Sequence, residues 1–389
     1  MTEGSFVERV YVLWGFRTPI VTKNNKFKYI PAEKLGAFVV QGIMNKIGRG
    51  LLPDGVIAGN AVGTGGNIAR LMCLTAGLPE EVPAFTVDMQ CASGATAIAM
   101  GYAQIASGNG DMYICGGMES SSLQPMRIYN ENDERFAKVS GGDGRYMTAQ
   151  FSPGELAENA MLLGADKTMA TEKVTKEELD FWTLRSHRLA AECADKGLLK
   201  DQIIPVEGIS KDDGIRYKMS QRLLDRLPKL LGGDSLLTAG NSCLINDGAA
   251  FVVLVSESWL KEHPEFTPKA ELLGTCTAGG SPVESPRGAM LTADKLLARQ
   301  GLLYEDMDAI EFNEAFAVID VLFQRQHPDL IDRYNMLGGA LAYGHPYGAS
   351  GGIIMIHLLK ALEIVGGDLG LMSVAGAGGM GQSILVRRL

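Results

Sequence analysis

A short internal repeat constrains the fold of this chain more than any other feature. Ala92-Ser93-Gly94 opens an apolar helical pattern that passes a Ser-Gly-Asn-Gly turn and leads into Met112–Cys115, followed by two glycines. Ala349-Ser350-Gly351 opens a second pattern of the same order, through Gly366-Gly367-Asp368 to Leu369–Val374 and a glycine-rich exit. Self-similarity of this kind is typical of related units packed against each other. The repeat therefore predicts two equivalent halves, each with special residues at a helix start.

Short apolar runs alternate with helical patterns along the chain. The apolar runs predict buried strands at Val10–Leu13, Val56–Ala58, Ala84–Val87, Met112–Cys115, Ala250–Val255, Ala309–Phe312, Tyr334–Leu337 and Leu369–Val374. The helical patterns predict helices over Glu33–Lys46, Ala92–Ile105, Ala293–Arg299 and Ala315–Gln326. Such alternation is typical of an α/β protein whose sheets are covered by helices.

The stretch Ser120–Asn241 differs in character from the rest of the chain. It holds most of the charge runs and little strand pattern, which indicates a mostly helical and irregular insertion. Such an insertion covers an active site in one interpretation and decorates the surface in the other. We expect an N-terminal half at 1–119 that is completed by 244–268, a loop domain at 120–243 over the active site, and a C-terminal half at 269–389.

Composition argues against several classes of function. A net charge of −9 disfavours a nucleic-acid surface, although a small basic patch for a phosphorylated ligand stays possible. The most apolar stretch, Ile353–Val365, is too short for a membrane span and contains His357, Lys360 and Glu363. Six cysteines without a C-x-x-C pair argue against a zinc site or a disulfide framework. The start at Met1–Ser5 lacks a signal sequence, so a cytoplasmic location is expected.

Cys91 is the first candidate for chemistry. It lies in Val-Asp-Met-Gln-Cys-Ala-Ser-Gly, directly after a predicted strand and before a predicted helix. The positive end of a helix dipole stabilises a thiolate, and the small residues that follow leave room for a substrate. A buried structural cysteine at a strand end is the other interpretation.

His345 is the second candidate. It lies in a loop of glycines and alanines, Gly338–Gly351, and a proline follows it. Its neighbours are too small to bury it, so the loop is suited to present the imidazole to a ligand, where it can accept a proton from Cys91. We expect the other four histidines to be surface residues or core residues with satisfied hydrogen bonds: His187, His263, His327 and His357.

Asn313 is the third candidate, in Asn313-Glu314-Ala315-Phe316-Ala317 after the predicted strand Ala309–Phe312. An asparagine at a strand end can fix a water or a substrate oxygen. Taken alone, the motif favours a helix N-cap with Glu314 in the first turn.

Together the three motifs resemble the thiolase family, in which a Cys-(Ala/Asn)-Ser-Gly loop, an Asn-Glu-Ala-Phe motif and a Gly-His-Pro-x-Gly-x-Ser-Gly loop occur in this order. The resemblance covers essentially the whole chain, since Arg17-Thr18-Pro19, Gly116–Ser120 and Asn246–Ala249 also match. It implies two βαβαβαββ halves in a layered α-β-α-β-α core with an inserted loop domain. It also implies acyl transfer between coenzyme A thioesters in fatty acid metabolism, no metal or tightly bound cofactor, and a homodimer or homotetramer.

The resemblance also implies roles for individual residues. Cys91, activated by His345, attacks a thioester or 3-ketoacyl carbonyl and becomes acylated. His345 and a water held by Asn313 form one oxyanion hole, and the backbone N–H groups of Cys91 and Ala377 form the other. Coenzyme A or the enolate of acetyl-CoA then takes the acyl group. Residues expected beside coenzyme A are Ser242, Phe316 and Ala377.

The chain departs from the family in its C-terminal loop. Most thiolases carry Cys-x-Gly-Gly-Gly there, and that second cysteine moves the proton at the α-carbon. Alignment on Gly378–Gly381 puts Ala375 in its place, and loss of a general acid/base costs ~10²–10⁴-fold in rate. Cys243, where many thiolases have serine, is one replacement, although a tolerated substitution explains it too. Ser373 is a weaker replacement, and Tyr347 departs from the usual aliphatic residue in the acyl pocket.

Other functions fit the sequence less well. An acyltransferase limited to the Cys91 half-reaction is suggested by Ala375. A non-catalytic acyl-CoA-binding subunit conflicts with intact Cys91, His345 and Asn313. A decarboxylating ketoacyl synthase needs a second histidine in place of Asn313, and a dinucleotide dehydrogenase needs a Gly-x-Gly-x-x-G that Gly63–Arg70 does not supply.

Overall fold

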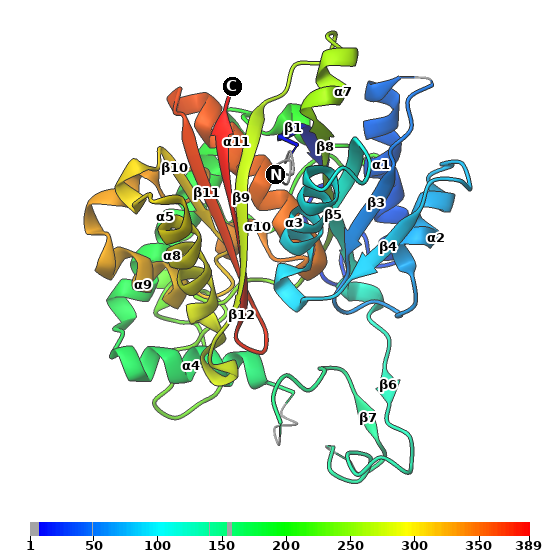
Figure 1. Ribbon diagram of the computed structural model, residues 1–389. Helices are drawn as coiled ribbons and strands as arrows, with labels where there is room; N and C mark the ends of the chain where they lie inside the picture. The colour runs from blue at the N-terminus through cyan, green and yellow to red at the C-terminus, as the bar shows by residue number, and fades with distance from the viewer. Residues whose placement is uncertain (1–7, 49, 140, 154–157) are drawn as a thin grey trace, which may run out of the picture.

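The computed structural model describes residues 8–48, 50–139, 141–153 and 158–389 (Figure 1). Met1–Ser5, on which the expected cytoplasmic location depends, lies outside these ranges. Ten strands join in one mixed sheet. Its strands in spatial order are β4 (Ala84–Val87), β3 (Gly55–Gly59), β5 (Met112–Ser120), β8 (Asn246–Ser256), β1 (Val10–Arg17), β9 (Ala270–Gly279), β12 (Met380–Arg388), β11 (Leu369–Gly376) and β10 (Ala309–Phe312), with β2 (Val21–Thr22) paired to β8.

The two ends of this sheet have the same topology, as the internal repeat predicts. β3 is parallel to β5, and β5 is antiparallel to β8; β10 is parallel to β11, and β11 is antiparallel to β12. The similarity extends to single side chains. Asp54, before β3, accepts from the backbone N–H groups of Asp111 and Met112 at 2.7 and 2.9 Å. Asp308, before β10, accepts from Asp368 and Leu369 at 2.7 and 3.1 Å.

The halves differ at one predicted strand. β4 forms as predicted, but Tyr334–Leu337, its counterpart, makes only an isolated bridge between Ile310 and Tyr334, so this prediction is wrong. The chain turns away because Asn335 adopts a left-handed conformation (φ 43°). Its side chain hydrogen-bonds both the N–H and the carbonyl of Phe312, which replaces continued strand pairing.

Helices cover both faces and fill the space between the two halves (Figure 1). α3 (Ser93–Ala106) and α11 (Ser350–Val365) form the central layer, and α11 packs on strands of both halves. α1 (Ala32–Ile47) and α2 (Ile68–Thr75) cover the outside of one half, and α8 (Gly288–Gln300) with α9 (Ala317–Gln326) covers the other. This is the layered α-β-α-β-α arrangement of the predicted fold class.

The central helices meet at their N-termini through glycines. A Cβ at Gly351 would lie 1.9 Å from the backbone nitrogen of Ala95, and one at Gly94 would lie 2.6 Å from the carbonyl oxygen of Gly348. Only glycine permits this approach. It brings the Cys91 turn and the His345 loop together from positions about 250 residues apart.

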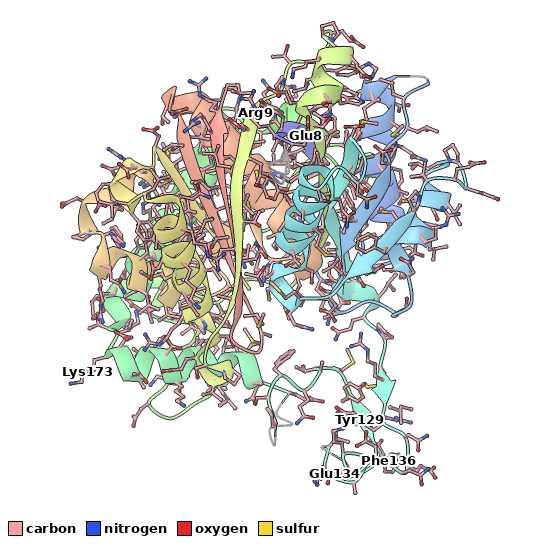
Figure 2. The ribbon with its side chains drawn as sticks, in the orientation of Figure 1. Glu8, Arg9, Tyr129, Glu134, Phe136 and Lys173 are labelled. Carbon is pink, nitrogen blue, oxygen red and sulfur yellow. The ribbon has the colours of Figure 1, made fainter. Side chains whose placement is uncertain are left out.

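The segment between β5 and β8 is mostly helical and irregular where it is described. It holds α4 (Ala160–Glu172), α5 (Lys176–Asp195) and α6 (Gln221–Leu224), and the two-residue strands β6 (Arg127–Ile128) and β7 (Arg145–Tyr146) pair on an excursion away from the body. Figure 2 labels Tyr129, Glu134 and Phe136 on this excursion, where Tyr129 stacks on Tyr146 at 4.2 Å. The domain boundaries stay a prediction.

One apolar segment of the described chain has the length and hydropathy of a membrane span, namely Tyr347–Val365 (19 residues, mean hydropathy 1.5). It comprises α11 and the turn before it, and 72% of it is buried within the protein. Its burial between the two halves is that of a core helix.

The remaining short elements are α7 (Glu257–Glu262), α10 (Ala340–Tyr343) and the 3-10 turns η1 (Gln90–Ala92), η2 (Ser121–Leu123), η3 (Lys200–Gln202), η4 (Pro282–Arg287), η5 (Tyr304–Asp306), η6 (Pro328–Arg333) and η7 (Tyr347–Ala349).

Candidate active site

Cys91 lies in η1, in a strained turn between β4 and α3. Gln90, just before it, adopts φ 52°, a left-handed conformation that is costly for a residue with a side chain. Two polar side chains hold the turn: Asp88 accepts from the Gln90 N–H at 2.9 Å, and Ser93 bridges Met89 and Gln90. Cys91 is buried, with 7% of its surface exposed. The turn therefore aims one thiol at a fixed point.

Burial dominates the electrostatics of Cys91 and raises the pKa of its thiol to about 12. The backbone N–H groups of Cys91 and Ala377 hydrogen-bond the sulfur and lower the pKa, while Glu119 and Asp88 raise it. Stabilisation of the Cys91 thiolate by the start of α3 stays a prediction, and desolvation acts against it in the resting protein. Cys91 rests as a neutral thiol beside two backbone donors.

His345 is buried at the other side of the same centre, with 1% of its surface exposed. Its backbone N–H donates to Asn246 Oδ1 and to the Leu244 carbonyl, both at 3.1 Å. The ring lies between two polar side chains: Nδ1 is 2.5 Å from Ser350 Oγ, and Nε2 is 3.3 Å from Asn313 Nδ2.

These contacts define the tautomer of His345. Ser350 Oγ donates its hydrogen to the Pro346 carbonyl at 3.1 Å, so it accepts from Nδ1–H. The Asn313 amide donates to the lone pair of Nε2. Burial lowers the pKa of His345 to about 3, so the ring is neutral. Nε2 is consequently a proton acceptor at rest.

Asn313 is not a helix N-cap, although its motif taken alone favours one. α9 begins at Ala317 after Phe316, and no side chain caps it. Asn313 is 2% exposed at the end of β10, and its amide faces His345. Tertiary contact overrides the local preference, because the amide has a buried imidazole as its partner.

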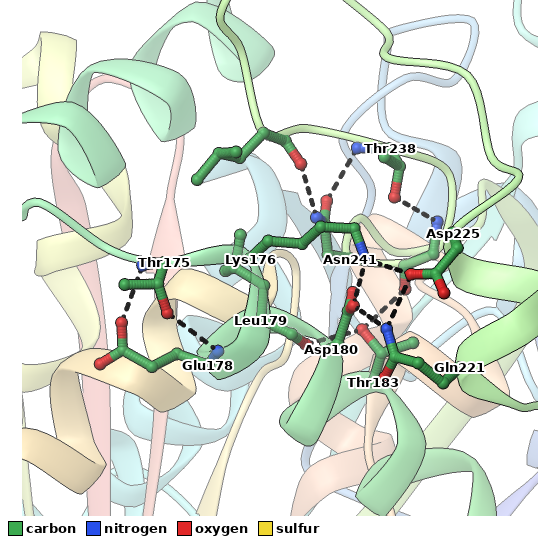
Figure 3. Close-up of polar contacts among 12 residues, drawn as sticks. Thr175, Lys176, Glu178, Leu179, Asp180, Thr183, Gln221, Asp225, Thr238 and Asn241 are labelled. Atoms are coloured by element: carbon green, nitrogen blue, oxygen red, sulfur yellow. Dashed lines mark hydrogen bonds and ion pairs between the residues drawn. The ribbon is translucent and has the colours of Figure 1, made fainter.

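Ser242 and Cys243 follow a turn that ends at Asn241, and Figure 3 shows the polar contacts that hold this turn. Thr183 of α5 donates to the Gly240 carbonyl at 3.2 Å, and Asn241 closes the turn by bonding Thr238 N–H and the Leu236 carbonyl. A bridge then pairs Ser242 with Phe316. The chain that carries Cys243 is thus fixed against the Asn313 motif, and the Ser242 hydroxyl is buried without a partner among the described residues.

Cys243 and Tyr347 complete the cluster around Cys91. Burial raises the pKa of the Cys243 thiol, and the charge of Cys91 raises it further. Burial also raises the pKa of Tyr347, with additional contributions from Cys243, Cys91 and Glu119. The Tyr347 ring packs edge-on against His345, with centroids 5.0 Å apart. Four titratable side chains therefore gather at one centre, where Cys91 and His345 are buried and Cys243 and Tyr347 are half-buried.

Ala375 and Ser373 lie on β11 and offer no proton donor to this centre. Ala375 is 5% exposed and pairs with Gly381. The Ser373 hydroxyl donates to the Ala289 carbonyl at 2.7 Å, and it lies 2.8 Å from Ser383 Oγ. It is thus engaged on the α8 side.

Glu119 is a residue of the site for which the sequence motifs indicated no role. It is fully buried at the end of β5 and accepts from Asn60 and from the N–H groups of Ala61, Val62 and Gly348 at 2.8 to 3.2 Å. Burial raises its pKa to about 7, against the effect of those donors. Glu119 ties the His345 loop to the first half, and an acidic residue closing an apolar strand was the available signal.

His357 corrects another expectation. It is 3% exposed on α11, and its Nε2 has no partner among the described residues, so it is not a satisfied core histidine. Within the described part of the chain, no three His, Cys, Asp or Glu side chains are grouped to hold a metal.

Known proteins resemble the chain over its whole length. Residues 10–258 match the family "Thiolase, N-terminal domain", and residues 266–388 match "Thiolase, C-terminal domain". A "Probable acetyl-CoA acyltransferase" of Staphylococcus aureus (strain NCTC 8325 / PS 47) is 33% identical over 398 residues, which is 98% of this chain and 99% of the relative.

Solved structures give the same result. The Bacillus anthracis acetyl-CoA acetyltransferase has a TM-score of 0.91 at 28% identity, covering 99% of this chain and 100% of that one. The human mitochondrial 3-ketoacyl-CoA thiolase in complex with CoA has a TM-score of 0.89 at 29% identity, covering 99% of each chain. The chain belongs to the thiolase family and is an acyltransferase.

Proposed function

We propose that the protein transfers acyl groups between coenzyme A thioesters through an acyl group carried on Cys91. The observation that supports this proposal is the meeting of η1, which carries Cys91, with η7 of the His345 loop, together with a neutral His345 ring whose Nε2 accepts. In the thiolytic direction the Cys91 sulfur attacks the 3-keto carbon, and its proton passes to His345 Nε2. The bond between that carbon and the α-carbon breaks, and its electron pair forms the enolate of acetyl-CoA.

Two groups of donors stabilise the developing oxyanions in this mechanism. The N–H groups of Cys91 and Ala377, which bond the sulfur at rest, are arranged to receive one oxyanion. Protonated His345 Nε2, with the amide of Asn313 beside it, donates to the other. His345 Nε2 becomes a donor only as the reaction proceeds, which favours the transition state over the ground state.

Cys243 is the proposed carrier of the α-proton in place of the thiol that Ala375 lacks. It gives its proton to the enolate carbon and is left as a thiolate. Incoming coenzyme A returns a proton to Cys243 and attacks the acyl group as its own thiolate. Cys91 then leaves and recovers its proton from His345, so the cycle closes without net proton loss. Its shared burial with Cys91 supports this role.

The substrate proposed is acetyl-CoA or a 3-ketoacyl-CoA. The relatives that support it are an acetyl-CoA acetyltransferase, a 3-ketoacyl-CoA thiolase in complex with CoA and a probable acetyl-CoA acyltransferase. No other tightly bound cofactor is needed for the steps above. Ser242 and Phe316, which pair beside Cys243, are the proposed neighbours of the coenzyme A arm. A cytoplasmic role in fatty acid metabolism is proposed with it.

A second candidate is an enzyme that completes only the acylation of Cys91. Ala375 favours it, because the usual proton carrier is missing from β11. An acyl-Cys91 formed without carbon–carbon cleavage passes its acyl group to another nucleophile in this alternative.

We also propose that two copies associate through the open edge of the sheet. β4 is an edge strand with half-buried residues, Phe85 is 37% exposed, and Leu71 and Leu74 of α2 are exposed beside it. Open edges are usually covered or paired. Exposed Met126 and Ile128 on the excursion are suited to join two dimers. Light scattering after gel filtration gives the mass, and a monomer at micromolar concentration would refute this proposal.

The proposed reaction is tested by intact-protein mass spectrometry with acetyl-CoA together with coenzyme A-dependent cleavage of acetoacetyl-CoA. The expected result is one acetyl adduct on Cys91 and measurable cleavage. An adduct without cleavage would select the half-reaction, and no adduct would refute every version given above.

A further inference from the structure

A small cavity lies between β10, α10 and α11, next to the proposed catalytic groups. Its volume is about 20 Å³, enough for one water molecule. Asn313 and Ser350, the two partners of the His345 ring, line it. Glu311 and His357 line it too.

Glu311 and His357 each bring an unpaired polar atom to this cavity. Glu311 is 2% and His357 3% exposed, and within the described ranges Glu311 Oε1 and His357 Nε2 have no hydrogen-bond partner. Buried polar atoms are rarely left unpaired, so two that line one water-sized space indicate a water that bonds both.

The protonation states of the two side chains are complementary. Burial and then Glu314 raise the pKa of Glu311 well above its usual range, against Arg185 and the Met336 N–H, so it is a carboxylic acid that can donate. Burial and then Arg17 lower the pKa of His357 to about 3, against Asp212, so its ring is neutral. Other groups that face the pair are Tyr334 and Cys193 near Glu311 and the Tyr343 ring, 5.0 Å from His357.

We propose that a water in this cavity connects Glu311, His357 and Ser350 into a proton relay that holds the Cys91 proton while the acyl group occupies Cys91. The proposal deepens the proposed function and depends on it. It assigns Glu311 and His357 as positioning and proton-holding residues that act through His345 and do not touch the substrate.

The relay moves one proton, and for this transfer the Ser350 hydroxyl turns from the Pro346 carbonyl to the water. His345 Nε2 takes the Cys91 proton, and Nδ1–H passes its proton to Ser350 Oγ. Ser350 passes its own hydroxyl proton to the water, and the water protonates His357 Nε2, with the Glu311 carboxyl bonded to the water. His345 is then neutral with Nε2–H, a donor for the oxyanion. The reverse sequence returns the proton to Cys91 when coenzyme A takes the acyl group.

The energetics favour such sharing. A proton kept on His345 makes a buried cation in a site whose burial lowers the pKa to about 3, and His357 has a pKa of the same size. Transfer between two imidazoles of matched pKa is nearly isoenergetic, which suits a store that must fill and empty.

The test compares His357→Gln, His357→Phe and Glu311→Gln with His187→Gln, a buried histidine outside the site (3% exposed), as the control. The assay is coenzyme A-dependent acetoacetyl-CoA cleavage in mixtures of H₂O and D₂O, with melting temperatures as a fold check. Both His357 variants are expected to lower kcat about 10-fold at unchanged KM, less than loss of a direct general acid or base, because His357 acts through Ser350 and His345. In the native enzyme, kcat is expected to depend on the D₂O fraction as it does when several protons move together. In the His357 variants it is expected to depend on the D₂O fraction as it does when one proton moves. Glutamine bonds the water but takes no proton, so a His357→Gln variant with native kcat and isotope dependence would overturn the relay.

A second measurement does not depend on turnover. The ¹⁵N resonance of His357 Nε2 in the resting protein is expected to shift in Glu311→Leu, because the water loses its donor; an unchanged resonance would overturn the bridge. If the native enzyme cleaves no acetoacetyl-CoA, the proposed function fails while this resonance still reports on the water.

Discussion

The two Ala-Ser-Gly turns of this protein use one serine in two ways. Ser93 Oγ donates to the Gln90 carbonyl at 2.6 Å and accepts from the Met89 backbone N–H at 2.8 Å. Ser350 Oγ also donates to a carbonyl of its own turn, Pro346 at 3.1 Å, but it accepts from the His345 ring. The first serine locks a backbone that carries a thiol, and the second orients an imidazole.

The two serines show how the halves of a duplicated fold contribute different groups to one reaction. In both turns the serine hydroxyl donates to a backbone carbonyl of the same turn, so this part of the architecture is shared. The turns differ only in the group that donates to the serine oxygen. The glycine contact at Gly94 and Gly351 then joins the turns. In the proposed mechanism, a nucleophile from one half and a base from the other complete a site that neither half contains alone.

Removal of the nucleophile is the strongest way to break this division. Cys91→Ala is expected to lower acetoacetyl-CoA cleavage by ~10⁴-fold or more and to abolish the acetyl adduct, because no other thiol lies on the strained turn. The adduct is read by mass spectrometry. Cys73→Ala, a buried cysteine on α2, is the matched control. An adduct that persists in Cys91→Ala would place the acyl group on another residue, with Cys243 the first to examine.

Most of the architecture could be predicted from the sequence because each copy of the repeat is a short motif of consecutive residues. The bounds of β4 and β10 are as predicted, and both Ala-Ser-Gly turns open the central helices. These features depend on apolar runs and on glycine, which sequence shows directly. The strand predicted at Tyr334–Leu337 does not form because the Asn335 side chain replaces strand pairing, and its partner Phe312 lies 23 residues earlier in the chain.

The site was harder to predict because its roles depend on contacts across the two halves. Asn313 alone reads as a helix cap, and only the His345 ring shows otherwise. Glu119 and His357 are ordinary residues in sequence, but burial gives one a pKa near 7 and leaves the other with an unpaired nitrogen. The raised pKa of Cys91 also depends on burial, which no motif encodes.

The halves also differ in the sign of their response to pH. Glu119 has a folded pKa of about 7 against 4.5, so its stabilising contribution is complete below pH 4.5 and is lost as pH rises through 7. His345 has a folded pKa of about 3 against 6.5, so its contribution is complete above 6.5 and is lost as pH falls toward 3. Glu119→Gln removes only the first effect.

The native protein should therefore lose about 3 kcal/mol of unfolding free energy relative to Glu119→Gln between pH 4.5 and 7, from a shift of about 2.5 pH units. Urea unfolding across this range measures the difference, and exposed Glu80→Gln is the control. Parallel curves for the native protein and Glu119→Gln would mean that Glu119 has an ordinary pKa in the fold.

Substitution of Cys243 tests whether its thiol replaces the one that is missing at Ala375. Cys243→Ser is expected to lower kcat for cleavage about 10²-fold while the Cys91 adduct still forms, because a hydroxyl is a much weaker proton carrier. Tyr347→Phe keeps the ring against His345 and removes only the phenol, so it separates the two neighbours of Cys91. Unchanged cleavage in Cys243→Ser, together with a slow Tyr347→Phe, would transfer the role to the phenol.

The two serines give the most direct test of the comparison, with the smallest expected effect. Ser350→Ala frees His345 Nδ1 and is expected to lower kcat/KM about 10-fold, roughly 1.4 kcal/mol of transition-state stabilisation. Ser93→Ala loosens the Cys91 turn and is expected to cost about 1 kcal/mol of unfolding free energy, since it removes hydrogen bonds from a backbone that is already strained. The ¹⁵N spectrum of His345 should change tautomer in Ser350→Ala and stay native in Ser93→Ala. If both variants lose stability alike and neither alters the imidazole, the serines are equivalent packing residues, and the division of labour must arise from the thiol and the ring themselves.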